Sequence, residues 1–163
     1  MSETSNPSGS AVPLTALAPT PPRARTKAIR IAAAGVADVP HASWTNGFIL
    51  GNEIVLSGMT AHPSSADPAK PLSTYEQTHV VLGKIKALLE GAGASIANIT
   101  KLVVYVTDIA DKDAVGKARK EFFADFGAFP ASTLVGVNAL VFPQLSVEIE
   151  AHARYDFDLR DLA

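Results

Sequence analysis

The segment LVVYV, residues 102–106, constrains the fold most, because its apolar side chains fall on both faces of an extended strand. Successive side chains of a strand point to opposite faces, so Val103 and Tyr105 share one face and the other three residues share the opposite one. A strand that is apolar on both faces is covered on both faces. The chain therefore needs two covering layers for this strand.

A helix is predicted before this strand. Ser73 and Glu76 have the spacing of a capping box, and Gly91 or Gly93 marks the end of the helix. Its apolar side chains form one stripe, which predicts an amphipathic helix with one face to bury. The residues of that stripe are Val81, Ile85, Leu88 and Leu89.

A second helix is predicted after the strand, from about Lys112 to Asp125, with Asp111 or Asp113 as its cap. Its buried stripe consists of Val115, Ala118, Phe122 and Phe123. Both helices thus have one apolar face, which suits packing on the same side of a sheet.

Further strands are predicted on both sides of this central part. The segment KAIRIAAAG (27–35) forms one, and Phe48–Leu50 and Glu53–Ser57 form a hairpin around a Gly51-Asn52 turn. Pro130–Arg154 contains two more, joined by a short loop. The order strand, hairpin, helix, strand, helix, strand, strand predicts an α+β sandwich of one sheet with two helices on one face.

Two helices can cover only one face of such a sheet. The apolar side chains on its other face, Val103 and Tyr105 among them, need a partner. Another copy of the same chain is the simplest partner, so the pattern predicts a homo-oligomer.

Composition excludes several classes of function. Only 18% of the 163 residues are charged and the net charge is −2, so there is no basic surface for a nucleic acid. The chain has no cysteine, which excludes disulfides, thiolate metal sites and a cysteine nucleophile. No phosphate-binding or dinucleotide glycine motif occurs, and neither a cofactor nor a metal ion is expected.

The first 26 residues differ from the rest, because five of the eleven prolines lie there among Ser, Thr and Ala. We expect residues 1–26 to be a disordered tail and residues 27–163 to form a single domain. Prolines interrupt every candidate signal sequence, and no apolar run approaches the ~20 residues of a membrane span. The sequence therefore predicts a soluble, cytoplasmic protein without a membrane partner.

The last predicted strand, LSVEIEAHA, alternates strictly. Its odd-numbered residues are small or apolar and face the helices, while Ser146, Glu148, Glu150 and His152 share the opposite face. These polar residues could form a solvated face or a working site. A metal site is disfavoured, because neighbours on one face of a strand lie ~6.6–7 Å apart, too far for three of them to hold one small ion.

The ordered motifs resemble those of the YjgF/RidA family. They are GNEIVLSG, EQTHVVLGKIKALLEGAGASIANITKLVVYVTDIAD, EFFADF, FPAST and SVEIEA, and the resemblance covers about Lys27–Tyr155. It implies a chorismate-mutase-like sandwich with a mostly antiparallel sheet. It also implies a homotrimer with a small-molecule cleft between each pair of subunits. The implied activity is hydrolysis of reactive enamines and imines to a keto acid and ammonia.

The resemblance also assigns site residues. The family's Ser-Gly pair falls on Ser57 and Gly58, and its catalytic glutamate falls on Glu148. Ser57 and Gly58 by themselves suit a plain turn equally well, and a lone tryptophan such as Trp44 suits a core or an interface. Three further positions carry a different residue here. Trp44 replaces a tyrosine, Gly116 an asparagine and Leu134 a cysteine.

The substrate-binding arginine of the family falls on Ser132. In deaminating members this arginine holds the substrate carboxylate with two parallel hydrogen bonds, which a neutral hydroxyl does not reproduce. The chain thus resembles a subgroup that lacks this arginine, in which Arg119 or Arg154 could supply a substitute charge.

Three functions follow from this comparison of motifs. The first is a small-molecule hydrolase in which Glu148 activates water or moves a proton, if the apolar rim of Trp44 and Leu134 raises its pKa by desolvation. The second is a non-catalytic trimer that binds a small molecule or stabilises other proteins. The third, an endoribonuclease, is disfavoured by the acidic chain.

Overall fold

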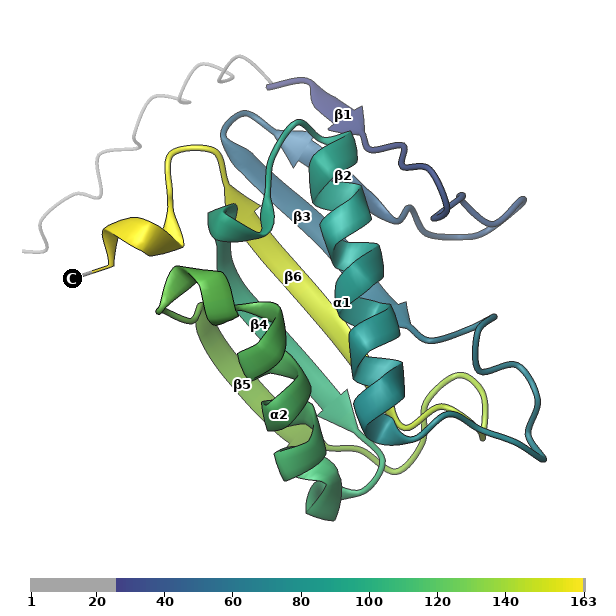
Figure 1. Ribbon diagram of the computed structural model, residues 1–163. Helices are drawn as coiled ribbons and strands as arrows, with labels where there is room; N and C mark the ends of the chain where they lie inside the picture. The colour runs from purple at the N-terminus through teal and green to yellow at the C-terminus, as the bar shows by residue number, and fades with distance from the viewer. Residues whose placement is uncertain (1–25, 163) are drawn as a thin grey trace, which may run out of the picture.

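Six strands form one sheet, and two helices pack on one of its faces (Figure 1). The computed structural model describes residues 26–162, so residues 1–25 of the predicted disordered tail lie outside the described part. The strands are β1 (Ala28–Arg30), β2 (Gly47–Leu50), β3 (Glu53–Thr60), β4 (Ile99–Val106), β5 (Ala131–Gly136) and β6 (Val147–Arg154). The helices are α1 (Thr74–Gly91) and α2 (Lys112–Phe122), and single 3-10 turns cover Ile96–Asn98, Ile109–Asp111, Ala124–Phe126 and Leu159–Asp161.

The sheet is mixed, with the strand order β1-β2-β3-β6-β4-β5. All neighbouring strands are antiparallel except β4 and β5, which are parallel. The predicted α+β class and the early meander are confirmed. The two last strands do not pair with each other, because β4 lies between them, and the connection 137–146 therefore crosses an end of the sheet.

Helix α1 has the predicted capping box. The Ser73 Oγ accepts a hydrogen bond from the Glu76 backbone N–H, and the Glu76 carboxylate accepts one from the Ser73 N–H at 2.8 Å. These bonds satisfy two backbone donors that the first turn would leave free. After the helix, Gly93 adopts a left-handed conformation with φ of 75°, which favours glycine and turns the chain towards β4.

Helix α2 is shorter than predicted, because it ends at Phe122 and a 3-10 turn follows. Asp111 occupies the N-cap position but makes no side-chain capping bond. Its carboxylate instead accepts a hydrogen bond from the Thr74 hydroxyl, 37 residues away, and so joins the start of α1 to the start of α2. The sequence cannot show that Asp111 bonds to Thr74 and not to the backbone of α2, because this choice depends on how the helices pack.

The core lies between the helices and one face of the sheet. Leu102, Val104 and Val106 are fully buried, whereas Val103 and Tyr105 on the opposite face are half-buried. The predicted alternation of the last strand is also confirmed. The residues with buried side chains there are Leu145, Val147, Ile149, Ala151 and Ala153.

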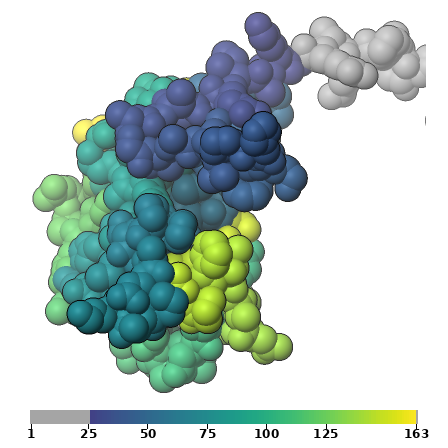
Figure 2. Space-filling model, turned by 90° about the vertical axis from the view of Figure 1, so that its right-hand side faces the viewer, coloured from purple at the N-terminus to yellow at the C-terminus, as the bar shows by residue number. Residues whose placement is uncertain are grey.

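The connections at the lower end of the sheet pack against each other. Figure 2 shows the yellow-green connection before β6 lying against the teal connection between β3 and α1. The Gln144 side chain donates to the Ala66 carbonyl at 3.2 Å, and the rings of His62 and Phe142 lie 4.8 Å apart. These contacts hold the end of β3 beside the start of β6.

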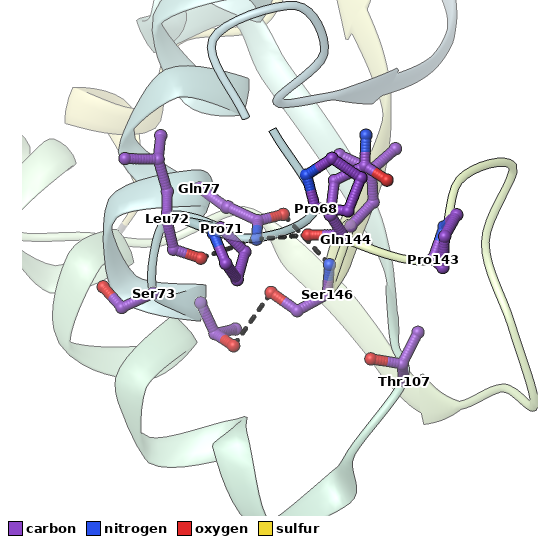
Figure 3. Close-up of a pocket in the computed structure, with 11 residues that line it drawn as sticks. Pro68, Pro71, Leu72, Ser73, Gln77, Thr107, Pro143, Gln144 and Ser146 are labelled. Atoms are coloured by element: carbon purple, nitrogen blue, oxygen red, sulfur yellow. Dashed lines mark hydrogen bonds between the residues drawn. The ribbon is translucent and has the colours of Figure 1, made fainter. Parts of the chain in front are cut away.

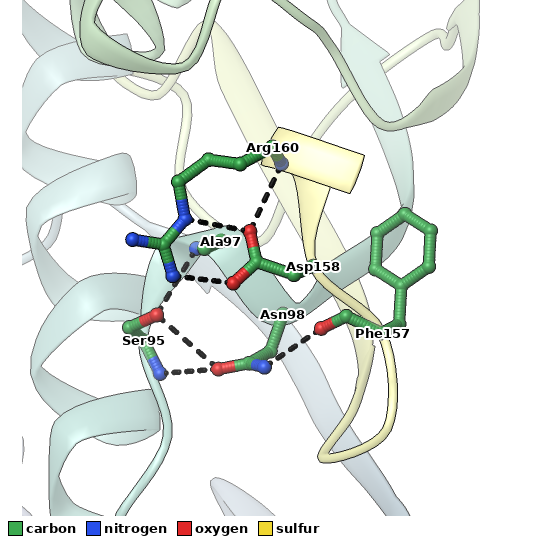
Figure 4. Close-up of polar contacts among 6 residues, drawn as sticks. All are labelled: Ser95, Ala97, Asn98, Phe157, Asp158 and Arg160. Carbon is green, nitrogen blue, oxygen red and sulfur yellow. Dashed lines mark hydrogen bonds and ion pairs between the residues drawn. The ribbon is translucent and has the colours of Figure 1, made fainter. Parts of the chain in front are cut away.

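The C-terminal turn is fixed by polar contacts (Figure 4). The Asn98 side chain donates to the Phe157 carbonyl at 2.8 Å and also caps the turn that begins at Ser95. Asp158 caps the last turn and pairs with Arg160.

Neither helix of residues 26–162 has the length and apolar character that a membrane span needs. The cytoplasmic location stays a prediction.

Candidate active site

A β-bulge brings Gly58 against Glu148. Leu56 pairs with Ala151 and Met59 pairs with Ile149, so Ser57 and Gly58 together oppose one residue of β6. The prediction that the strand ends at Ser57 is therefore wrong. The bulge absorbs the extra residue and lets β3 continue to Thr60.

Gly58 leaves room for the Glu148 carboxylate. A Cβ atom built on Gly58 would lie 2.0 Å from the Glu148 Oε1 and 2.9 Å from its Cδ. No side chain fits in that position unless the carboxylate moves. The predicted pair of Gly58 and Glu148 is thus brought together by the structure, in direct contact.

Ser57 positions the segment that carries Trp44. Its hydroxyl donates to the Thr45 carbonyl at 2.6 Å, and its backbone N–H donates to the Asn46 carbonyl at 3.0 Å. The hydroxyl proton of Ser57 is therefore already donated, and this oxygen can only accept a bond from a ligand. Trp44 is 55% exposed, so it is not a core residue of the single chain.

Glu148 has an unusual electrostatic environment. Its half-buried side chain has no hydrogen-bond partner among the described residues, and burial raises the pKa of its carboxyl group. The charge of Glu150 raises this pKa further. Glu148 therefore keeps a proton to higher pH than an exposed glutamate does.

Glu150 is held by Tyr105, whose hydroxyl donates to the Glu150 Oε1 at 3.2 Å. Tyr105 lies directly opposite Glu148 in the register of β4 and β6, and Glu150 is its diagonal neighbour. Burial raises the pKa of Tyr105, and both glutamates add to the effect. The sequence indicated Tyr105 only as an apolar cover. Its polar role depends on a strand register that the sequence does not reveal.

The other predicted site residues lie on the opposite side of the sheet. Ser132 pairs with Leu102 and Leu134 pairs with Val104 in the parallel register, so both side chains share the face that the helices cover. Leu134 packs against the core, while Ser132 is exposed at the edge strand. Gly116 lies on α2, which covers this side.

One chain therefore presents two separate groups of predicted site residues. Glu148, Gly58 and Ser57 lie on the central strands β3 and β6, and the second group lies at β5 and α2. Two strand spacings and the thickness of the sheet separate Glu148 from Ser132. The predicted rim of Trp44 and Leu134 around Glu148 does not form within one chain. Leu134 faces the other side, and Glu148 is desolvated by its own neighbours instead.

Comparison with known proteins decides the family. Residues 36–155 match the family model described as Endoribonuclease L-PSP. The 2-iminobutanoate/2-iminopropanoate deaminase of Escherichia coli K12 is 33% identical over 112 residues, which are 68% of this chain and 85% of that protein. The chain belongs to the YjgF/RidA family.

Solved structures of this family share the fold. A protein of unknown function from Pseudomonas aeruginosa has a TM-score of 0.81 and 56% identity, covering 85% of this chain and 99% of that one. The TdcF protein of Escherichia coli, solved with bound serine, has a TM-score of 0.67 and 27% identity, covering 78% and 99%. The resemblance predicted from the motifs is therefore confirmed at the level of the family.

Of the two arginines that could replace the family's anchor, Arg154 is already paired. Its guanidinium contacts Asp156 at 2.9 Å and Glu53 at 3.2 Å. A second anion would have to compete with both carboxylates.

Among residues 26–162, no group of three or more His, Cys, Asp or Glu side chains is placed to hold a metal ion.

A depression of about 340 Å³ lies at the start of α1 (Figure 3). Its polar groups bond to one another. The Gln77 side chain donates to the carbonyls of Leu72 and Gln144 and accepts from the Ser146 N–H. The Ser146 hydroxyl donates to the Thr74 Oγ1, because Thr74 gives its own proton to Asp111. None of the predicted site residues lines it. This network fixes the connection before β6.

Proposed function

We propose that this chain is a small-molecule hydrolase that deaminates imines or enamines, with Glu148 as its acid and base. The observation that carries the proposal is the half-buried carboxylate of Glu148, which packs on Gly58 without a hydrogen-bond partner and has a raised pKa. A group whose pKa lies closer to neutral exchanges protons more effectively in a reaction at neutral pH.

The proposed reaction needs only water and this carboxyl group. A water molecule adds to the carbon of the C=N bond, and Glu148 accepts the proton that the water loses. Glu148 returns this proton to the nitrogen, which gives an intermediate with a hydroxyl and an amino group on the same carbon. Glu148 then takes the proton of this hydroxyl and passes it to the amino nitrogen, so the C–N bond breaks and ammonia leaves as the C=O bond forms. An enamine enters the same sequence after it is protonated on carbon. The names of relatives that deaminate 2-iminobutanoate and 2-iminopropanoate support this class of substrate.

We further propose that the site is completed in a homotrimer, in clefts between neighbouring subunits. The half-buried apolar face with Val103 and Tyr105 supports an interface between copies of the chain. The separation of Glu148 from Ser132, Leu134 and Gly116 supports it too, because a second copy can bring the second group to the first.

The direct test is hydrolysis of 2-iminopropanoate that is generated in situ, with release of pyruvate as the readout. We expect the chain to accelerate the release, and Glu148→Gln to lower kcat by about 10²–10⁴-fold, as for loss of a general acid or base. The matched control is Glu53→Gln, which neutralises an exposed glutamate of β3. No acceleration by the natural chain, or equal rates for Glu148→Gln and the natural chain, would contradict the proposal.

A non-catalytic binding trimer is the second candidate. The neutral Ser132 at the anchor position favours it, as does the Ser57 hydroxyl that is already engaged with Thr45. In this case the natural chain and Glu148→Gln bind the same small molecule equally well and neither turns it over. An endoribonuclease is disfavoured, because a net charge of −2 gives little attraction for RNA.

A further inference from the structure

Arg119 differs from the other arginines of the described residues. Arg30, Arg154 and Arg160 each form an ion pair with a carboxylate, and Arg119 forms none. Its Nε is buried and has no hydrogen-bond partner among residues 26–162. The chain itself encloses this atom, so a ligand can reach only the two terminal nitrogens of Arg119, which have no hydrogen-bond partner among residues 26–162 and are not enclosed.

The surroundings of Arg119 form a small depression of about 180 Å³. It is lined by Gly116, Arg119, Lys120 and Phe129. No acidic side chain lines it, and a Cβ built on Gly116 would meet nothing within 4 Å. The space is therefore open, carries two positive charges and has an apolar wall at Phe129, whose side chain is half-exposed. Burial lowers the pKa of Arg119, as expected for a cation without a nearby anion.

The depression lies on the same side of the sheet as the second group of site residues. Gly116 belongs to both, and α2 packs with Leu134 of β5 on the same core (Figure 1). Arg119 of α2 thus lies on the side of the sheet where Ser132, in the exposed edge strand β5, stands at the position of the family's arginine.

We propose that Arg119, with Lys120 beside it, binds the carboxylate of the substrate in the depression next to Gly116. This inference rests on the proposed function. A guanidinium binds a carboxylate through two parallel hydrogen bonds, and the two terminal nitrogens of Arg119 are the donors that can form them in the depression. The positive charge that Ser132 does not provide is then supplied from the neighbouring helix.

The first test uses pyruvate, the keto acid expected from 2-iminopropanoate, as the probe. In nitrogen-15 NMR of the full chain, we expect the Arg119 Nε–Hε signal to shift as pyruvate is added, and acetone, a neutral molecule of similar size, to leave it unchanged. If pyruvate binds and this signal stays in place, the inference is wrong. This readout needs no variant, so it does not depend on how a variant folds.

The second test uses substitutions. Arg119→Met keeps much of the length of the side chain without the charge, and we expect it to weaken pyruvate binding at least tenfold, while Arg119→Lys retains part of the affinity. The control is Arg160→Met, which removes an exposed arginine of the C-terminal turn. Circular dichroism verifies that each variant is folded. Equal affinity of Arg119→Met and the natural chain would overturn the inference.

Kinetics separate this inference from the proposed function. We expect Arg119→Met to raise KM for 2-iminopropanoate, whereas Glu148→Gln lowers kcat. If the natural chain deaminates and Arg119→Met leaves KM unchanged, the inference fails and the proposed function stands. If Arg119 binds pyruvate but the chain does not deaminate, the proposed function fails and the binding site stands.

Discussion

Among single residues, Glu148 has the environment most suited to proton transfer. Glu150 gains a hydrogen bond from Tyr105, and Glu148 gains only burial and the repulsion of its neighbour. Two carboxylates on one face of one strand thus have different environments, set by a single hydroxyl group. In the proposed function Glu150 orders the site and Glu148 exchanges the proton.

This difference makes the stability of the chain depend on pH through Glu148. Its pKa in the folded chain lies above the ordinary 4.5, so the folded state disfavours the ionised form. The penalty is absent well below 4.5, grows as pH rises towards the raised pKa, and is complete above it. We therefore expect Glu148→Gln to increase the free energy of unfolding at neutral pH and to lose this gain at acid pH.

Chemical denaturation at several pH values measures this effect. Glu90→Gln is the control, because Glu90 is an exposed residue of α1 that pairs only with Lys86. We expect it to change stability little at any pH. A stability difference for Glu148→Gln that does not vary with pH would show that its carboxyl group has an ordinary pKa.

The family motifs assigned Glu148, Ser57 and Gly58 to one site, and the structure brings Gly58 and Glu148 into contact. The sequence could not predict that the Ser57 hydroxyl donates to the Thr45 carbonyl, or that the Arg119 Nε has no hydrogen-bond partner among residues 26–162. Both depend on how loops and helices pack, and packing brings together residues that are far apart in the sequence.

Among the elements, the ends of α1 were predicted well and the end of β3 was not. The cap of α1 is formed by Ser73 and Glu76, which are three residues apart, so a local pattern contains the whole signal. The bulge in β3 exists only because the strand pairs with β6, about ninety residues later. For the same reason, the sequence did not reveal that β4 separates β5 from β6.

The bulge makes a prediction about glycine. Gly58→Ala places a Cβ 2.0 Å from the Glu148 Oε1, the end of a flexible side chain, so we expect the carboxyl group to move and activity to fall at least tenfold. The fold tolerates this movement, and we expect stability to fall by at most about 1–3 kcal/mol. Pyruvate release and chemical denaturation measure the two effects.

The matched control is Gly83→Ala in the middle of α1, where a Cβ would meet nothing within 4 Å. We expect this change to increase the free energy of unfolding by roughly 0.5–1 kcal/mol, because alanine loses less backbone freedom in a helix. Activity stays as in the natural chain. If Gly58→Ala is fully active, the Glu148 carboxyl group does not need its present position.

In the whole molecule, the face of the sheet opposite the helices is the main unexplained surface. It is half-buried in the single chain at Val103 and Tyr105, and Val135 beside Tyr105 in the register is 40% exposed. The chain offers no third layer for this face among residues 26–162. The proposed trimer supplies that layer from other copies and also joins the two groups of site residues.

A charge at Val103 tests this assembly. Val103→Arg suits the single chain, because Val103 lies opposite Glu150 in the antiparallel register and an arginine there faces a carboxylate. An arginine is much larger than a valine and would press against the neighbouring subunit at this face. We therefore expect the molecular mass in solution to fall from three times 17.0 kDa to one, and deaminase activity to be lost with it. Analytical ultracentrifugation measures the mass.

The control is Val141→Arg, the same change at a residue that is 70% exposed in the connection before β6. We expect it to leave mass and activity unaltered. A trimer that survives Val103→Arg would place the interface elsewhere. A natural chain that is already monomeric would leave Glu148 and Ser132 on opposite sides of the sheet, and the cleft between subunits would have to be abandoned.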